Sequence, residues 1–286
     1  MDWELDLYQW WNVYPYSSPD GLYLDSLLWE KELSAQLTAR FPFNKFQRLE
    51  LGVGYSYLSW YHLFYSQGYF WEGQEEYPQR VQVYGGLVHD DALLSWVLGP
   101  LDGKRLFLGA WASVPWFGVQ QKLVWADLRR YFHITPRSIW AWRLAGGYTW
   151  GPDALPLWVG GPTTLRGYDD YQFTGDGVFY MNSELRVPFI DKLKLGFIPI
   201  ELEGLRGVLF LDMGAALREG EKFVPAEDWH LKDLKAGIGA GLRFFLYYFT
   251  LKLDFARRTD FSKLLGPEDD GLPWDWIFYI TFGTDW

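Results

Sequence analysis

The 286-residue sequence contains no cysteine, which excludes both a disulfide framework and a thiolate metal site. It also lacks any run of about eighteen apolar residues, so the sequence predicts no transmembrane helix. Residues 1–6 carry neither the basic region nor the apolar region of an export signal. Because the chain begins directly in a strand pattern, we expect that a signal preceded this sequence and was removed.

Positive charge is scarce as well, with 26 basic against 36 acidic residues, a net charge of −10 and a pI near 4.9. Nucleic-acid binding needs a basic stripe or patch, so the composition argues against a nucleic-acid partner. The histidines are scattered, without the spacing of metal ligands: His62, His89, His133 and His230. We therefore expect no enzymatic activity, no metal site and no cofactor.

Aromatic residues are abundant by contrast: they make up 20% of the chain and include 18 tryptophans. Tryptophan and tyrosine concentrate where a protein surface meets lipid headgroups. The mean hydropathy is nevertheless only −0.15. Both values fit a transmembrane β-barrel, because its lipid-facing and lumen-facing residues alternate and cancel in any average. A soluble β-sandwich or barrel remains the alternative, since its strands alternate too.

Alternation of apolar and polar residues predicts the strands. At the N-terminus Trp3 and Leu5 would lie on one face and Glu4 and Asp6 on the other. The second strand could also be helical, because residues 31–39 are good helix formers, but its strict alternation favours a strand. About twelve strands are expected, an even number as in bacterial single-chain barrels. Their approximate ranges are 2–8, 32–40, 48–57, 80–98, 106–114, 121–132, 140–149, 179–189, 209–215, 234–244, 249–256 and 276–286.

The connections between these strands differ in length. Long ones follow most odd-numbered strands, as at 12–25 and 59–79, with a short exception at 115–119 and a long one after an even strand at 191–204. Short ones follow most even-numbered strands: 41–45, 100–103, 135–137 and 246–248. Transmembrane barrels have short periplasmic turns and long outer loops, so this pattern places both termini in the periplasm.

The polar faces favour a membrane barrel over a soluble one. Lys235, Gly237, Gly239, Gly241 and Arg243 share one face of a predicted strand. In a dry soluble core the two charges would be buried without partners, at a cost of several kcal/mol each. Facing a wet lumen they cost little, and the glycines leave room for another segment to pack against this wall.

A glycine-rich segment interrupts the strands at residues 160–168, with the sequence GGPTTLRGY. We expect it to be a loop that folds back into the lumen. The predicted fold is therefore all-β: one transmembrane, antiparallel, up-and-down β-barrel domain covering residues 1–286, with about twelve strands and an inward-folded loop.

Several short motifs follow one another from this loop to the end of the chain. They are LRGY at 165–168, NSELRVP at 182–188, FLDMG at 210–214, GAGLR at 239–243, LDFA at 253–256 and FGTDW at 282–286. In this order they resemble the outer-membrane assembly and secretion barrels of the BamA/TamA/FhaC type, the bacterial surface antigen barrels. The resemblance covers roughly the last 130 residues, whereas the first half matches only in its strand rhythm.

The resemblance implies that Arg166 of the Leu165–Tyr168 motif is tethered inside the barrel by acidic residues of neighbouring strands, here Glu184 and Asp212. Alternation independently places both carboxylates on the lumen face. A guanidinium offers a planar fork of five donors that two carboxylates can satisfy, and Gly167 lets the chain turn tightly beside it. The alternatives are an exposed loop arginine and two solvated carboxylates.

By the same resemblance, Phe282, Gly283 and Trp286 belong to a C-terminal signal, and the barrel would close between residues 3–10 and 276–286. The sequence departs from the family in three respects. It has no POTRA repeats, about twelve strands where the best-known members have about sixteen, and no signal peptide. We therefore expect the C-terminal barrel only.

The resemblance implies a non-enzymatic barrel of the bacterial outer membrane, or an equivalent organelle membrane, that aids the insertion or passage of polypeptides. Its partners would be the lipid bilayer and unfolded outer-membrane or secreted client polypeptides. One alternative is a membrane anchor or surface antigen for a partner or fused periplasmic domain. Another is a narrow pore, which we consider weaker because a folded-in loop would plug a barrel of about 12 Å backbone radius.

Overall fold

The computed structural model describes residues 1–16, 26–66, 69–76, 79–95, 99–135, 138–195, 200–227, 230–246, 249–259 and 276–283. The regular elements in these ranges are β-strands. Within the same ranges, no helix has the length and apolar character needed to cross a membrane. The second strand, which the sequence left open between helix and strand, is extended.

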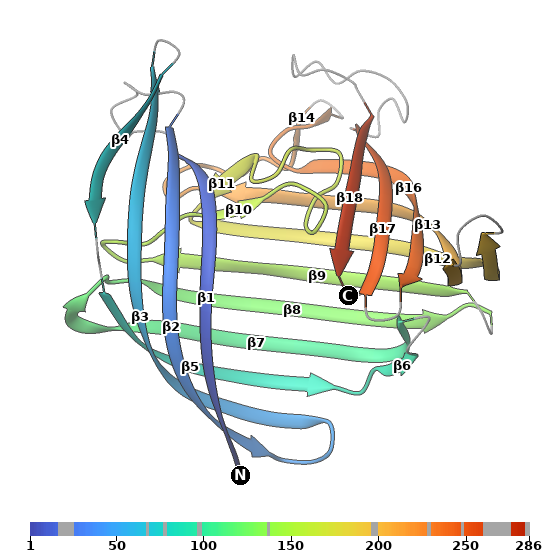
Figure 1. Cartoon of the computed structure of the whole chain (residues 1–286), viewed down its shortest axis with the longest axis horizontal. Coiled ribbons are helices and arrows are strands. Elements are labelled where there is room, and N and C mark those ends of the chain that lie inside the picture. The colour runs from blue at the N-terminus through green and yellow to red at the C-terminus, as the bar shows by residue number, and fades with distance from the viewer. Residues whose placement is uncertain are drawn as a thin grey trace. The chain divides into compact units, whose positions relative to one another are not determined.

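One sheet runs through the chain as a meander, in which strands that follow one another along the path are neighbours (Figure 1). Its twelve strands are β1 (Asp2–Tyr16), β2 (Ser26–Pro42), β3 (Gln47–Ser66), β5 (Gln79–Asp90), β7 (Gly99–Gly118), β8 (Lys122–His133), β9 (Ile139–Trp150), β12 (Gly177–Leu195), β13 (Ile200–Leu217), β16 (Lys235–Leu246), β17 (Phe249–Thr259) and β18 (Ile277–Gly283). This confirms the predicted all-β, antiparallel fold of about twelve strands. β1 and β18 are the two ends of the strand order.

Six short strands lie off this path. β4 (Tyr69–Glu76) pairs with β3, and β6 (Leu93–Ser95) pairs with β7. Two small sheets are formed by β10 (Leu157–Val159) with β11 (Phe173–Gly175), and by β14 (Ala226–Glu227) with β15 (His230–Leu231). The β10–β11 pair brackets the glycine-rich segment that the sequence singles out.

The chain divides into two compact units. The first comprises Met1–Val88, Leu108–Val124 and Thr149–Leu155. The second comprises His89–Phe107, Trp125–Tyr148 and Pro156–Trp286, and it holds every motif of the second half of the sequence.

In the first unit, large apolar side chains are exposed and polar side chains are buried. Trp3, Leu5 and Leu7 of β1 are 61%, 65% and 73% exposed, whereas the hydroxyl groups of Ser34 and Ser56 lie buried on the opposite face. Soluble proteins bury their large apolar side chains, so this pattern is reversed. A transmembrane barrel requires the reversal because its outer face contacts lipid.

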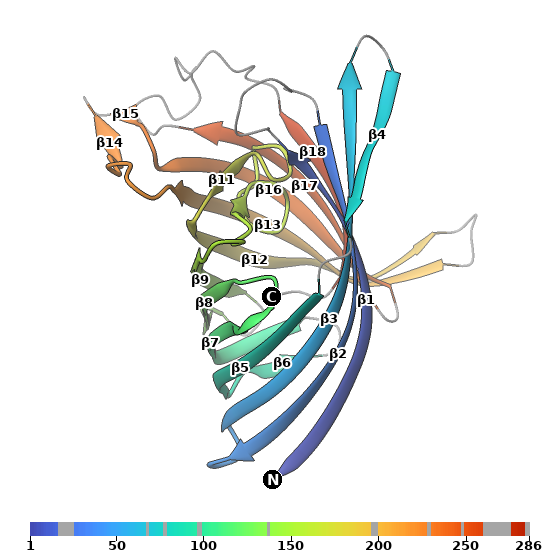
Figure 2. The ribbon, with the colours of Figure 1, turned by 90° about the vertical axis from the view of Figure 1, so that its left-hand side faces the viewer.

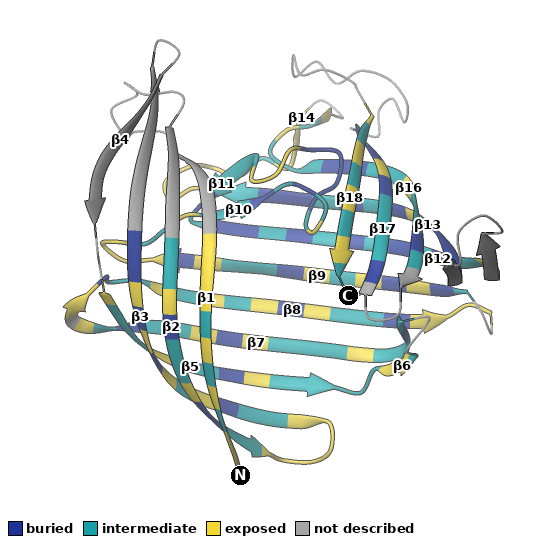
Figure 3. Cartoon of the chain, in the orientation of Figure 1, coloured by how far each residue is buried: buried dark blue, intermediate teal, exposed yellow. Residues whose placement is uncertain are grey.

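The second unit has the same polarity. Leu144, Phe255 and Ile280 are exposed, while Arg166 and Asp212 are buried. Along β8 and β9 of Figure 3, buried or half-buried positions alternate with exposed ones, as the period of two in a strand dictates. The charged faces that the sequence assigned to a lumen are thus the buried faces of this unit.

Two predicted loops are partly extended. Of the loop expected at 12–25, residues 12–16 belong to β1, and the remainder lies outside the described residues. The loop expected at 59–79 is wrong over most of its length, because β3 continues to Ser66 and pairs with β4. Aromatic residues favour extended backbone, and Tyr and Trp combine an apolar ring with a polar group. Such residues suit either face of a strand, so the sequence of this hairpin shows no clean alternation of apolar and polar residues.

The turn predicted at 100–103 is also wrong, because these residues belong to β7. β5 stops at Asp90, ten residues before the expected turn. The Asp91 carboxylate accepts a hydrogen bond from the Lys104 amide at 2.6 Å, and Gly103 has a φ of 94°. The Pro-Leu-Asp-Gly sequence therefore makes an irregularity in a paired strand and not a chain reversal.

The long connection predicted at 191–204 is wrong as well. β12 and β13 stay paired as far as Leu195 and Ile200, with one irregularity between Pro188 and Ile190. The connection is therefore short, like the one between Leu246 and Phe249 that the sequence did predict. The polar residues within 191–204 gave this stretch the composition of a loop. Strands of a transmembrane barrel can stay paired outside the apolar band that faces lipid, and there they need no apolar face.

Candidate functional site

The glycine-rich segment lies between β10 and β11, on one side of the strands β12, β13 and β16 (Figures 1 and 2). Its base is the β10–β11 ladder, in which Val159 pairs with Phe173. An isolated bridge between Gly161 and Leu165 tightens the chain within the segment. The segment is thus a small substructure that rests on the buried, polar face of the second unit.

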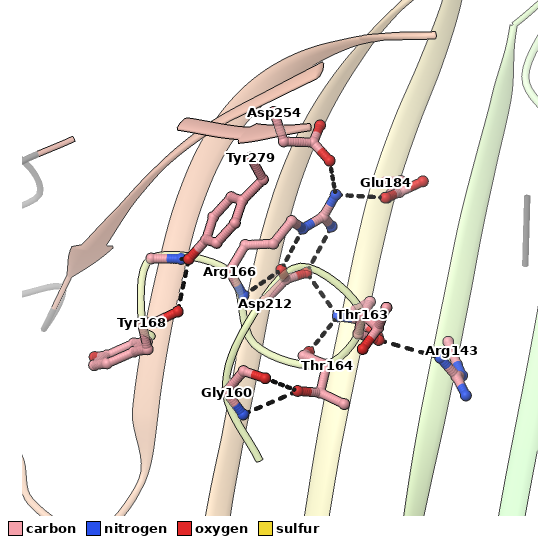
Figure 4. Close-up of polar contacts among 12 residues, drawn as sticks. Arg143, Gly160, Thr163, Thr164, Arg166, Tyr168, Glu184, Asp212, Asp254 and Tyr279 are labelled. Carbon is pink, nitrogen blue, oxygen red and sulfur yellow. Dashed lines mark hydrogen bonds and ion pairs between the residues drawn. The ribbon is translucent and has the colours of Figure 1, made fainter. Parts of the chain in front are cut away.

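Local hydrogen bonds shape the tip of this segment. The Thr164 hydroxyl accepts a hydrogen bond from the Gly160 amide at 2.9 Å and donates one to the Gly160 carbonyl at 2.8 Å. Gly167 has a φ of 98°, a conformation that side chains disfavour, and this lets the chain turn directly after Arg166. The turn sends the neighbouring side chains of Arg166 and Tyr168 toward different strands (Figure 4).

An apolar cluster holds the body of the segment. Leu165 and Tyr168 are buried together with Val159, and they pack with Val178 and Tyr180 of β12. Burying a side chain of this size stabilises a structure by about 1.5–3 kcal/mol. The segment therefore has its own small core on an otherwise polar face.

Arg166 is the polar anchor, and its guanidinium points into the sheet (Figure 4). Nε and Nη2 donate to the two carboxylate oxygens of Asp212 on β13 at 2.6 and 2.9 Å. Nη1 donates to Glu184 on β12 at 2.8 Å and lies 3.5 Å from a carboxylate oxygen of Asp254 on β17. The guanidinium also stacks 3.5 Å from the centre of the Phe210 ring.

The anchor is part of a larger network of buried charges. Glu184 accepts two more hydrogen bonds from Arg186, at 2.9 and 2.8 Å. Asp254 accepts one from Arg243 at 2.6 Å. Three arginines thus face three carboxylates, Glu184, Asp212 and Asp254, and all six side chains are buried. Mutual neutralisation makes the burial of these charges tolerable.

The protonation state of Arg166 follows from this environment. Burial alone would lower the pKa of Arg166, but the carboxylates of Asp212 and Glu184 raise it above its ordinary value. The guanidinium therefore stays charged. The network pairs fixed cations with fixed anions, an arrangement suited to holding a segment in place.

A second connection joins the segment to the last strand. The Gly167 amide donates to the Tyr279 hydroxyl of β18 at 3.0 Å, and that hydroxyl donates to the Tyr168 carbonyl at 2.7 Å. The Tyr168 hydroxyl in turn donates to the Ala236 carbonyl of β16 at 3.2 Å. The tip is therefore fixed to β12 and β13 by charge, and to β16 and β18 by neutral hydrogen bonds.

The three glycines predicted to leave room do so for different neighbours. A Cβ at Gly237 would collide with the Arg166 carbonyl, so this glycine admits the segment itself. A Cβ at Gly239 would meet the Phe210 ring and the Phe255 backbone, and one at Gly241 would meet the Asp254 carboxylate. The first glycine thus makes room for the segment, and the other two make room for groups that surround its arginine.

The structure brings together most of the residues that the sequence singled out, namely Leu165, Arg166, Gly167, Tyr168, Glu184, Asp212 and Gly237. Phe282 and Gly283 lie at the end of β18, with the Phe282 side chain exposed on the apolar face. Trp286 lies outside the described residues. The role of these three residues as a C-terminal signal stays a prediction.

Sequence reasoning did not assign several residues to the network around Arg166: Asn182, Arg186, Arg243, Asp254 and Tyr279. A signal was available, because alternation places each of them on the polar face of its strand. Alternation does not give the position of each residue along its strand relative to Arg166, and that position decides whether the two side chains are in contact.

The polar His89–Asp91 stretch forms separate local contacts. His89 lies 3.0 Å from Asp91, and Asp90 accepts a hydrogen bond from Arg105 at 2.9 Å. In the part of the chain that the structure describes, no group of three or more His, Asp or Glu side chains is arranged to hold a metal ion.

In a comparison with protein families, the Omp85 superfamily domain matches residues 28–286 of this chain. A comparison with curated protein sequences gives no match.

Solved structures share the fold. BamA from Haemophilus ducreyi lacking POTRA domains 1–3 superposes with a TM-score of 0.66 at 14% identity, over 97% of this chain and 62% of that one. CdiB from Acinetobacter baumannii gives 0.57 at 14% identity, over 98% of this chain and 46% of that one. CdiB from Escherichia coli gives 0.57 at 15% identity, over 98% and 49%. The chain thus spans about half to three fifths of the length of these proteins.

Proposed function

The chain belongs to the Omp85 superfamily, and on this premise we propose that it is an outer-membrane β-barrel that aids the insertion or passage of polypeptides. The proposal takes residues 1–286 as one barrel domain with both termini in the periplasm. Its partners would be the lipid bilayer and unfolded outer-membrane or secreted polypeptides. The observation that carries it is the anchoring of Arg166 between Glu184 and Asp212, which fixes a segment on the polar face.

The proposed mechanism uses the difference between the two connections of this segment. The Arg166 connection consists of charge-assisted hydrogen bonds to buried carboxylates, which are roughly twice as strong as neutral ones. The Tyr279 connection to β18 consists of two neutral hydrogen bonds. β18 is therefore the strand that separates from the segment at lower cost, while β12 and β13 stay attached.

This difference matters because β18 and β1 end the strand order. We propose that the barrel closes between these two strands and that this seam opens to a client polypeptide. The segment then acts as an inner support that remains in place when β18 moves. No step of this mechanism needs an enzymatic group, a metal or a cofactor.

A client-insertion assay tests the proposal. Liposomes containing the folded chain are mixed with an unfolded outer-membrane barrel protein, and the rate of client folding is compared with that in empty liposomes. Acceleration by the wild-type chain supports the proposal, and we expect Arg166→Ala to reduce it. Arg218→Ala, which removes an exposed arginine, is the matched control and should keep the wild-type rate. A wild-type rate equal to that in empty liposomes would contradict an assembly role.

The main alternative is a barrel that serves only as a membrane anchor or surface antigen for a partner or fused periplasmic domain. The chain would then fold stably in liposomes without accelerating a client. A narrow pore is distinguished by planar-bilayer conductance: the anchored segment predicts small, intermittent currents, whereas a steady, large conductance would favour diffusion.

A further inference from the structure

A cavity of about 330 Å³ adjoins the Arg166 anchor within the second unit. Two carboxylates line it, Glu184 and Asp254. Its cationic lining residues are more numerous: Arg105, Arg129, Arg143, Arg166, Arg243 and Lys252. The chain as a whole carries a net charge of −10, so the lining of this cavity has the opposite sign to the protein.

The two carboxylates of the lining are already neutralised. Glu184 accepts hydrogen bonds from both Arg166 and Arg186. Asp254 accepts one from Arg243 at 2.6 Å and lies 3.5 Å from Arg166. Neither carboxylate is therefore available to balance the remaining cations of the lining.

Two of the other cations, Arg129 and Arg143, are in excess of their shared partner. Arg129 and Arg143 share a single carboxylate, that of Asp127, with contacts of 2.7 Å from each guanidinium. Two positive charges thus face one negative charge. Arg143 also donates to the Thr163 carbonyl at 3.4 Å, which holds its guanidinium at the rim of the segment.

We propose that this cavity binds a phosphate-type oxyanion, either free phosphate or the phosphorylated headgroup of a lipid. Guanidinium groups match the oxygens of a phosphate with paired N–H donors, and several of them converge here. The lining also contains Thr163 and Thr281, whose hydroxyl groups are further donors. A cleft lined by one sign of charge between low-dielectric walls concentrates the opposite ion.

A phosphate fits this site better than a simple carboxylate. One guanidinium satisfies one carboxylate in a bidentate pair, as Asp212 and Arg166 illustrate nearby. Arg129 and Arg143 carry one positive charge more than Asp127 neutralises, and a phosphate has enough oxygens to accept paired N–H donors from both guanidinium groups at once. This inference does not depend on polypeptide handling, because binding is measured without a client.

Titration calorimetry of the full chain, folded in a detergent with a neutral headgroup at low ionic strength, tests the proposal. Inorganic phosphate should bind saturably to the wild-type chain. Arg129→Gln should weaken that binding by about tenfold, since a hydrogen bond to a charged group is lost. Lys252→Gln is the second variant, and thermal melting of each variant verifies that it is folded.

Arg130→Gln is the matched control, because Arg130 follows Arg129 on β8 but lies over the exposed Phe132 ring, 4.9 Å from its centre. Its phosphate affinity should equal that of the wild type. Tighter binding of glycerol 3-phosphate than of phosphate assigns the site to a lipid headgroup, and equal binding assigns it to the free ion. The proposal is overturned if phosphate does not saturate, if Arg130→Gln weakens binding as much as Arg129→Gln, or if acetate binds as tightly as phosphate.

Discussion

The polar faces of the two units are built from different groups. In the first unit most of the buried polar groups are hydroxyl groups: the Ser34 hydroxyl donates to that of Ser56 at 2.7 Å, and the Tyr84 hydroxyl donates to the Glu50 carboxylate at 3.0 Å. In the second unit arginines and carboxylates dominate, with Arg166 and Asp212 among the most buried residues. Ion pairs occur in the first unit too, as between Arg80 and Glu32 at 2.8 Å, but they are less deeply buried than those around Arg166 in the second unit.

The difference shows what each face requires. Hydroxyl groups can satisfy one another across neighbouring strands, so the first unit needs no additional segment over Ser34 and Ser56. Asp212 is different, because a buried carboxylate without a cation costs several kcal/mol. The segment that carries Arg166 supplies that cation, and this explains why the anchored segment belongs to the second unit.

The largest effect is expected from Asp212→Ala. Removal of this carboxylate leaves the buried guanidinium of Arg166 with one of its three hydrogen bonds, the one to Glu184, which should lower the free energy of unfolding by about 3–5 kcal/mol. Urea unfolding of the chain in detergent micelles measures this change. Asp169→Ala, an exposed carboxylate of the same segment, is the control and should change the stability by less than about 0.5 kcal/mol. Equal losses in the two variants would remove the distinction between the two faces.

Gly237→Ala should have the next largest effect, about 2 kcal/mol, because the new Cβ collides with the Arg166 carbonyl and displaces the segment. Gly85→Ala in the first unit is matched to it, since the atom nearest to its added Cβ is 3.7 Å away, in ordinary contact. The same unfolding measurement should find Gly85→Ala close to the wild type. Equal stability of the two variants would mean that the segment does not pack against Gly237.

Tyr279→Phe removes the hydroxyl that connects the segment to β18, and it leaves the Gly167 amide and Tyr168 carbonyl without this partner. We expect a loss of about 1 kcal/mol and faster proteolysis within residues 160–172. Tyr55→Phe removes an exposed hydroxyl of the first unit that donates to Gln79, and it should alter neither property. Unchanged proteolysis in Tyr279→Phe would argue against the connection.

Ser56→Ala should have the smallest effect of the series, about 0.5–1 kcal/mol, because it removes one neutral hydrogen bond from the first unit. Thermal melting of Ser56→Ala and of Asp212→Ala, measured under the same conditions, compares the stability that the two polar faces lose. A loss as large as that of Asp212→Ala would mean that hydroxyl groups hold the first unit as strongly as charges hold the second.

Much of this architecture is predictable from the sequence, because alternation reports directly on a sheet with one apolar and one polar face. Trp3 and Leu5 were assigned correctly to the apolar face, and about twelve strands were expected. The motifs around Arg166 gave the superfamily. Strand ends were harder to predict, as the residues near Pro100 illustrate: turn-forming residues also occur at irregularities within paired strands.

The site was predicted less completely than the fold. Glu184 and Asp212 were named as partners of Arg166, and they contact it. Asp254 and Tyr279 were not, although alternation put them on the same face. Contact across several strands depends on strand register and stagger, which a period of two does not specify.

A double-mutant cycle on Arg166 and Asp212 tests the central claim most directly, namely that this ion pair anchors the segment. The free energy of unfolding is measured for the wild type, Arg166→Ala, Asp212→Ala and the double variant. If the pair is the anchor, the double variant should be little less stable than Asp212→Ala alone, with a coupling energy of about 2–3 kcal/mol. Additive losses, with a coupling below about 0.5 kcal/mol, would contradict it.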